Sequence, residues 1–144
     1  MPLHLLKLCV GCDSVDDLVA WQAGRVAEAR AAGAPPYPVH VTRMRPRREA
    51  ELLDGGSLYW VIRGLVLVRQ PILGLETRVG ADGIARCALR LDPAVTRTAP
   101  QPRRAFQGWR YLPAGDAPAD LTADAAAEAV PPALARELAE LGVL

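Results

Sequence analysis

The sequence of 144 residues has one lysine against sixteen arginines, no asparagine, two serines, two histidines and three cysteines. The preference for arginine, together with 25 alanines, is typical of a GC-rich genome, so the positions of the arginines are more informative than their identity. Neither serine lies in a G-x-S-x-G elbow, and the chain contains no Walker A loop, G-x-G-x-x-G or H-E-x-x-H motif. These absences favour a protein without catalytic residues.

Long apolar runs are also missing. The longest run, Leu58 to Val68, is interrupted by Arg63 and is shorter than the roughly 18 residues of a membrane span. The N-terminal stretch lacks the basic lead and the small-residue cleavage site of a secretory signal. Three cysteines are too few for a disulfide framework and suit a reducing compartment. We expect a cytoplasmic protein that does not engage a membrane.

Charge is distributed unevenly along the chain. Residues 40–110 hold 13 arginines against six acidic residues, a balance of +7, whereas residues 1–39 carry −1 and residues 111–144 carry −5. The basic middle favours RNA or another polyanion as the partner. The acidic end could instead fold over the basic middle as an internal neutraliser or a gate.

Hydrophobic patterning predicts a mixture of strands and short helices. A strand is expected from Leu3 to Val10, apolar on both faces apart from His4 and Lys7 and therefore central in a sheet. Ser14 is a helix N-cap with Asp17 three residues later, and the helix ends near Ala32. Further strands are expected at 37–43, 57–63, 65–73 and 84–91, a short helix at 46–53, a proline-punctuated loop from Thr98, and extended chain from Phe106.

These elements predict one α+β domain over residues 1–121, followed by an acidic, Ala/Pro-rich helical tail over 122–144. The sheet is expected to be strongly bent and mostly antiparallel, or a partly open barrel, with five to seven strands and flanking helices. Tight hairpins are expected at Gly64 and at Asp82-Gly83.

The pair Cys9-Val-Gly-Cys12 has three interpretations. A redox pair needs a thiol with a lowered pKa, but the nearby aspartates raise a thiol pKa. A zinc site needs three or four ligands, and the chain offers Cys9, Cys12, Cys87, His4 and His40 without a second paired motif. The third interpretation makes Cys9 and Cys87 small core residues and places Cys12 in a tight strand-to-helix turn. No cofactor is expected, with zinc as the alternative.

Two stretches combine arginine with aromatic residues, "HVTRMRPRR" and "PRRAFQGWRYL". Arginine pairs with phosphate, and exposed aromatic rings stack on unpaired bases. The aromatic residues at 106–111 could equally belong to the core. The candidate nucleic-acid-binding residues are Arg43, Arg45, Arg47, Arg48, Trp60, Arg63, Arg103, Arg104, Trp109 and Arg110.

The stretches "KLCVGCDSVDDL", "HVTRMRPRR", "GGSLYWVIRG" and "RRAFQGWRYL" resemble a bacterial family known as domain of unknown function 1489, over roughly residues 3–121. The resemblance implies no activity and no catalytic residues. The order of elements is also similar to the PUA-like group, including its ASCH and EVE relatives, and this implies binding of RNA or modified bases.

The hypothesis that follows is a non-catalytic RNA-binding module. Two alternatives stay open: a small metal- or thiol-dependent enzyme built on Cys9, Cys12 and Cys87, and a protein-interaction domain in which the edge formed by "YWVIRGLVLV" pairs with a partner.

Overall fold

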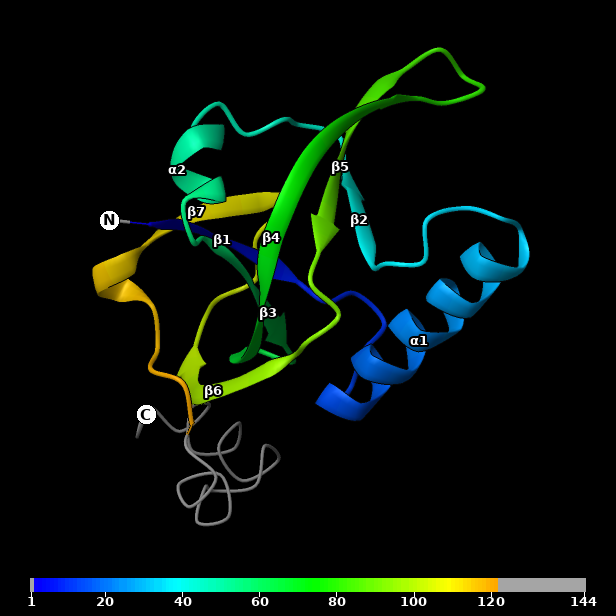
Figure 1. Cartoon of the computed structure of the whole chain (residues 1–144). Helices are drawn as coiled ribbons and strands as arrows, with labels where there is room; N and C mark the ends of the chain where they lie inside the picture. The colour runs from blue at the N-terminus through cyan, green and yellow to red at the C-terminus, as the bar shows by residue number, and fades with distance from the viewer. Residues whose placement is uncertain (1, 122–144) are drawn as a thin grey trace.

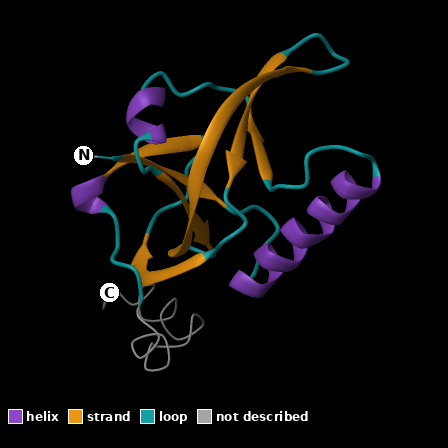
Figure 2. Ribbon diagram, viewed as in Figure 1, coloured by secondary structure: helices purple, strands orange, loops and turns teal. Residues whose placement is uncertain are grey.

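The computed structural model describes residues 2–121. The expectations for the acidic tail, residues 122–144, lie outside the described residues. Two helices, a 3₁₀ turn and seven strands make up the described chain (Figures 1 and 2). In chain order they are β1 (Leu3–Leu8), α1 (Val15–Ala31), β2 (Val39–Thr42), α2 (Glu49–Leu53), β3 (Ser57–Ile62), β4 (Leu65–Val79), β5 (Ala85–Leu91), β6 (Thr96–Pro102), β7 (Trp109–Pro113) and η1 (Ala114–Asp116).

The strands form one large, open and mostly antiparallel sheet, which confirms the predicted α+β class. Its order is β2-β5-β4-β3-β1-β7, with β6 also paired to β4, and the β1–β3 pair is parallel. The 15-residue β4 holds the sheet together: its first half pairs with β3 and β6 and its second half with β5 (Figure 1). The register shifts between Ile72 and Gly74, where the partner of β4 changes along the strand.

Glycine is favoured at two turns, at one by the backbone conformation and at the other by lack of space. Arg63 and Gly64 have φ of 50° and 84° between the paired residues Ile62 and Leu65, which is the two-residue hairpin expected at Gly64. At Gly56, between α2 and β3, a Cβ atom would lie 2.3 Å from the carbonyl oxygens of both Leu3 and Leu52. Only glycine lets β3 begin this close to β1.

The strand β6 corrects the sequence analysis, which expected a proline-punctuated loop there. Thr96–Pro102 pairs antiparallel with β4 despite Pro100 and Pro102. Proline lacks the N–H group that a two-sided strand needs, so it is tolerated where one side of a strand stays unpaired. In the described residues β6 pairs with β4 and, through the single bridge Thr98–Asp120, with the segment that follows η1.

Burial follows the alternation of side chains across the sheet. One large cluster contains Leu5, Leu58, Trp60 and Leu89, and a smaller one on the opposite face contains Tyr59 and its neighbours. All six residues of β3 are buried, because β3 lies inside the sheet and is covered on both faces. Apart from its exposed turn at Arg63 and Gly64, the stretch "YWVIRGLVLV" is therefore interior, and within residues 2–121 it presents no free strand edge.

Helix α1 begins as its sequence predicts. Ser14 is the N-cap, its hydroxyl accepting from the Asp17 amide at 3.1 Å, and the Asp17 carboxylate accepts from the Asp13 amide at 2.9 Å. Of its residues, Val15, Leu18 and Gln22 are buried. The helix lies beside the sheet and touches it along this narrow stripe (Figure 1).

A buried amide network joins α1 to the sheet. The Gln70 and Gln22 side chains exchange two hydrogen bonds, of 2.7 and 2.8 Å. Gln70 Oε1 also accepts from the Trp60 indole N–H at 2.8 Å, and its amide nitrogen donates to the Asp92 carbonyl at 3.1 Å. Gln70 is fully buried and satisfied, so it fixes both the helix and the Trp60 ring.

We expect Gln70→Leu to lower the free energy of unfolding by about 3 kcal/mol, because the Trp60 N–H and the Gln22 amide lose a buried partner. Chemical denaturation measures this loss. Gln101→Leu is the matched control, since Gln101 bonds Arg103 and the Asp116 carbonyl nearer the surface, and about 0.5 kcal/mol or less is expected. Equal losses of unfolding free energy in the two variants would show that the buried Gln70 network stabilises the fold no more than hydrogen bonds nearer the surface do.

Candidate nucleic-acid interface

The two end strands of the sheet, β2 and β7, are brought together by aromatic side chains. The Trp109 indole N–H donates to the Met44 carbonyl at 2.7 Å. The Tyr111 hydroxyl accepts from the backbone amides of Arg47 and Arg48, at 3.0 and 3.1 Å. The Trp109 and Tyr111 rings also meet edge to face, 4.8 Å apart. Both rings are half-buried, so they are structural on one side and accessible on the other.

A cleft of about 380 Å³ lies between these strands. Its cationic side chains are Lys7 from β1, Arg43 just after β2, and Arg110 from β7, and its floor includes Trp109. The other lining residues are Val41, Thr42, Met44, Gln107 and Gly108. We call this space the seam cleft. Three separate segments of the chain, at residues 7, 41–44 and 107–110, thus meet around one hollow.

Lys7 is the one cationic residue of this cleft that was not among the candidate binding residues predicted from the sequence. It pairs with Trp60 of β3 on one side and Trp109 of β7 on the other, so the three residues form one row across the sheet. Burial lowers the pKa of Lys7, and its ammonium group donates to the Gly108 carbonyl at 3.4 Å. The sequence did carry one signal for this residue, because the only lysine of the chain lies inside a mostly apolar strand.

A smaller hollow of about 200 Å³ adjoins the seam cleft and shares Lys7 with it. It is lined by Cys9, Trp21, His40 and Trp60, together with Leu8 and Val10. We call it the ring pocket. The His40 and Trp60 rings meet edge to face at 5.2 Å, and His40 Nε2 is buried with no hydrogen-bond partner among the described residues. Burial above all, then the charges of Lys7 and Arg25, lowers the pKa of His40 to about 4.

Of the predicted arginines, Arg43 and Arg110 line the cleft, and several others are engaged elsewhere. Arg45 is paired with Glu49 and bonded to Thr77, and Arg48 is paired with Glu51. Arg63 is ion-paired with Asp13, Arg103 is hydrogen-bonded to Gln101, and Arg47 and Arg104 are exposed. Arg110 lines the cleft, while its guanidinium lies 5.2 Å from the centroid of the Phe106 ring and donates to the Gln107 and Trp109 carbonyls.

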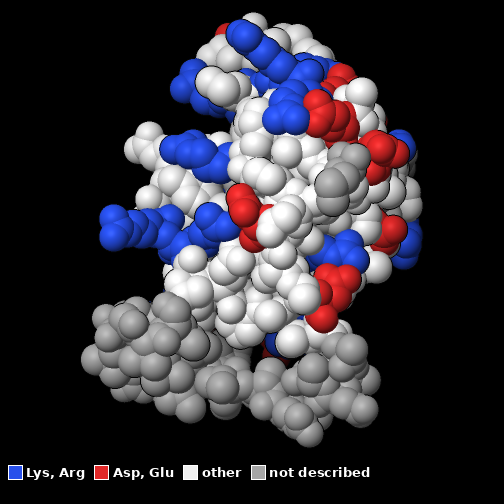
Figure 3. All heavy atoms as spheres, turned by 90° about the vertical axis from the view of Figure 1, so that its left-hand side faces the viewer, with Lys and Arg blue, Asp and Glu red and all other residues white. Residues whose placement is uncertain are grey.

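Figure 3 shows how charge is spread over the face that carries α2 and η1. Basic side chains project from its left edge, while Asp and Glu side chains lie mostly further right, next to other basic side chains. Basic and acidic side chains are thus mixed on this face, which does not present a single uniform basic patch. The cations that converge on a hollow are those of the seam cleft.

The prediction that Trp60 stacks on bases at an exposed basic face does not fit its burial. It is only 2% exposed, and its N–H group is held by Gln70. Its ring edge contributes to the ring pocket instead. The sequence pattern could not show this, because burial of Trp60 depends on the contacts of β3 with strands distant in sequence.

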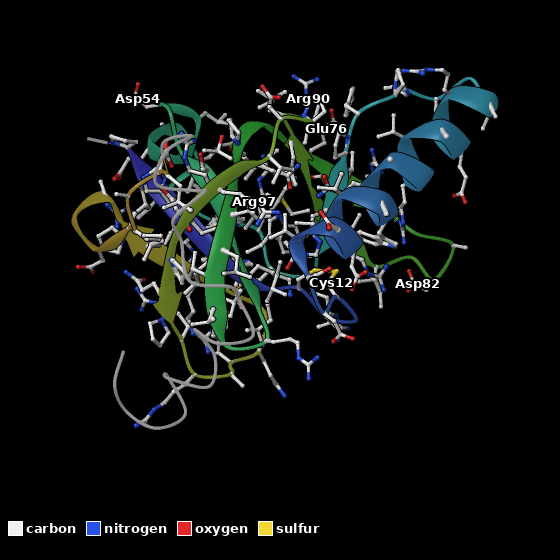
Figure 4. The ribbon with its side chains drawn as sticks, turned by 90° about the horizontal axis from the view of Figure 1, so that it is seen from below. Cys12, Asp54, Glu76, Asp82, Arg90 and Arg97 are labelled. Atoms are coloured by element: carbon white, nitrogen blue, oxygen red, sulfur yellow. A yellow bond between two sulfur atoms is a disulfide. The ribbon has the colours of Figure 1, made fainter. Side chains whose placement is uncertain are left out.

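The cysteines of the Cys-x-x-Cys pair are joined. Cys9 and Cys12 form a disulfide, with Cα atoms 5.7 Å apart, and Figure 4 shows Cys12 beside the first turn of α1. Cys12 is buried in the main core and Cys9 packs against it, as the core interpretation expects, but that interpretation did not include a disulfide. Cys87 is a buried free thiol, and burial raises its pKa.

The alternative zinc ligands are not assembled. Over residues 2–121, no group of three or more His, Cys, Asp or Glu side chains is placed to hold a metal ion. His4 is committed elsewhere, since its Nδ1 accepts from the Ser57 amide at 2.9 Å. Ser57 in turn accepts from Arg69, which makes a two-pronged ion pair with Asp120. This cluster ties the end of the described chain to β4.

Comparison with known proteins identifies the family. The family model described as "Protein of unknown function (DUF1489)" matches residues 5–144, and the chain belongs to that family. No curated protein and no solved structure matches the chain. Similarity to the PUA-like group therefore stays an expectation. Among the described helices, none is long and apolar enough to span a membrane.

The depressed pKa of His40 predicts a pH-dependent stability. Unfolding returns its pKa from about 4 to 6.5, so the stabilisation is complete above pH 6.5 and is lost as the pH falls toward 4. Between pH 7 and pH 5 this amounts to about 2 kcal/mol of unfolding free energy. Burial also lowers the pKa of His4, which acts in the same direction.

Chemical denaturation of the wild type and of His40→Leu at both pH values measures the effect. The variant is expected to lose most of the decline between pH 7 and pH 5, and the remainder reports His4. An unchanged decline in the variant would mean that His40 is protonated equally easily in the folded and unfolded chains.

Proposed function

We propose that this protein binds single-stranded RNA, without catalysis, in the seam cleft. The observation that carries the proposal is that Lys7, Arg43 and Arg110 all line one hollow together with Trp109. Cations neutralise the phosphates, and an accessible indole can stack on an unpaired base. The proposed setting is the cytoplasm.

A single strand fits this cleft better than a duplex. The apolar side chains at its rim, Val41 at 44% and Met44 at 70% exposure, offer contact surface to base faces. A duplex keeps its base faces stacked inside, whereas single-stranded segments expose them. The exposed apolar rim therefore supports an unpaired strand.

Thiol chemistry at Cys9 and Cys12 is the weaker candidate. The disulfide favours it, but Asp13, Asp16 and Asp17 surround the pair with negative charge, which opposes thiolate formation. Cys12 is also only 8% exposed, which restricts attack by a second thiol.

The expected dependence of binding on salt follows from the three cations. If each neutralises one phosphate, log K falls against log salt with a slope of about −2, at roughly −0.7 per contact. In Arg43→Ala/Arg110→Ala the slope flattens to about −0.7, and binding to a uridine decamer weakens at low salt. Fluorescence anisotropy with a labelled decamer measures both quantities.

Arg30→Ala is the matched control, because Arg30 is an exposed arginine in the last turn of α1 and is not part of the cleft. It should leave the slope unchanged. Two results would contradict the proposal: no binding tighter than about 100 μM, the weak end of ordinary non-specific affinity, or equal effects of the Arg30 and the Arg43/Arg110 substitutions.

A further inference from the structure

We propose that the ring pocket binds one single-ring nucleobase, either an unstacked pyrimidine of a bound strand or the base of a free nucleoside. This inference rests on the proposed function where the base belongs to a strand. The two sources share the same chemistry: a planar heterocycle that presents a hydrogen-bonding edge.

The pocket shares one lining residue, Lys7, with the seam cleft. The row Trp60–Lys7–Trp109 runs across three neighbouring strands from one hollow to the other. A strand whose phosphates lie on Arg43 and Arg110 would therefore pass close to Lys7, which also lines the pocket. A base that swings away from its neighbours would have a place to enter.

The lining suits a flat ring. Trp21, Trp60 and His40 supply three aromatic rings from α1, β3 and β2. Trp60 is immobilised by Gln70, and Trp21 is 45% exposed with the Arg25 guanidinium 4.7 Å from its ring centroid. Aromatic rings held in place bind a planar partner with little loss of side-chain entropy.

The polar groups suit the edge of a base. At neutral pH His40 is uncharged and has one donor and one acceptor nitrogen, and its Nε2 lacks a partner among the described residues. Nε2 is closed to solvent in this structure, so a base edge reaches it only when a neighbouring side chain moves aside. A buried polar atom without a partner is costly, and in native proteins it usually indicates a missing partner. The edge of uracil or cytosine carries the complementary donors and acceptors, and the Lys7 ammonium adds a donor for a carbonyl oxygen.

Exposed apolar side chains gather at the same place. Val10 and Trp21 border the ring pocket, and Val41 and Met44 border the seam cleft. They are four of the nine large apolar side chains that are exposed among the described residues. Such concentration around hollows is typical of a ligand-binding surface.

The size limits the occupant. A volume of about 200 Å³ is below the roughly 300–1,000 Å³ of pockets that enclose whole ligands. The pocket therefore holds one ring, and the ribose and phosphate groups remain in the larger seam cleft. For this reason the expected occupant is a pyrimidine rather than a purine.

The test compares a uridine pentamer with a sugar-phosphate pentamer that carries no bases, using fluorescence anisotropy. The wild type should bind the intact strand at least about ten-fold more tightly than the base-free strand. Trp21→Ala should weaken binding of the intact strand about ten-fold and leave binding of the base-free strand unchanged. Val19→Ala is the matched control, because Val19 is on the same helix with the same 45% exposure but does not line the pocket.

Arg43→Ala/Arg110→Ala should instead weaken both strands equally, which separates the pocket from the phosphate contacts. His40→Leu is a second variant, with thermal unfolding as the check of its fold, and it should behave like Trp21→Ala. The pocket inference is overturned if the wild type binds both strands equally, or if Trp21→Ala and Val19→Ala behave alike.

Free uridine distinguishes a failure of the pocket from a failure of the proposed function. If neither strand binds but uridine quenches tryptophan fluorescence in the wild type and not in His40→Leu, the proposed function is wrong and the pocket stands. If both strands bind, and bind equally, the proposed function stands and the pocket inference is wrong.

Discussion

The buried amide of Gln70 is the interaction on which the other features of this structure depend. It bonds Gln22 of α1, the indole of Trp60 and the carbonyl of Asp92, so one fully buried side chain joins the helix, the sheet and the turn after β5. Removing one member leaves the others unpaired in a low-dielectric interior, where an unpaired polar group is most costly. The ring pocket exists because this network holds α1 beside Trp60.

A second constraint acts between the two end strands of the sheet, β2 and β7. Trp109 and Tyr111 of β7 bond backbone groups of the segment after β2, and these side chains take the place of a ladder of backbone hydrogen bonds. A continuous ladder would bring the strands to about 4.8 Å and close the hollow. Side-chain bridges keep the strands further apart and leave room for the seam cleft. The same rings can therefore be structural and still present a surface to a ligand.

Local signals predicted much of the fold but little of the site. The Ser14 cap, the Gly64 hairpin and the apolar first strand each depend on neighbouring residues, and all three predictions are confirmed. The strand β6 was missed because edge position, which makes its prolines acceptable, is a property of the whole sheet. Lys7 was missed as a binding residue because its neighbours in the cleft come from strands distant in sequence.

The central claim is that the surface between β2 and β7, together with the pocket beside it, binds an unpaired nucleic-acid strand. The three tryptophans make nuclear magnetic resonance the most direct test, since each indole N–H gives its own signal. On titration with a uridine pentamer, the account predicts shifts at Trp21 and Trp109 and none at residues 80–84 of the distant β4–β5 hairpin. Shifts at the hairpin, with the Trp21 and Trp109 signals unmoved, would contradict it.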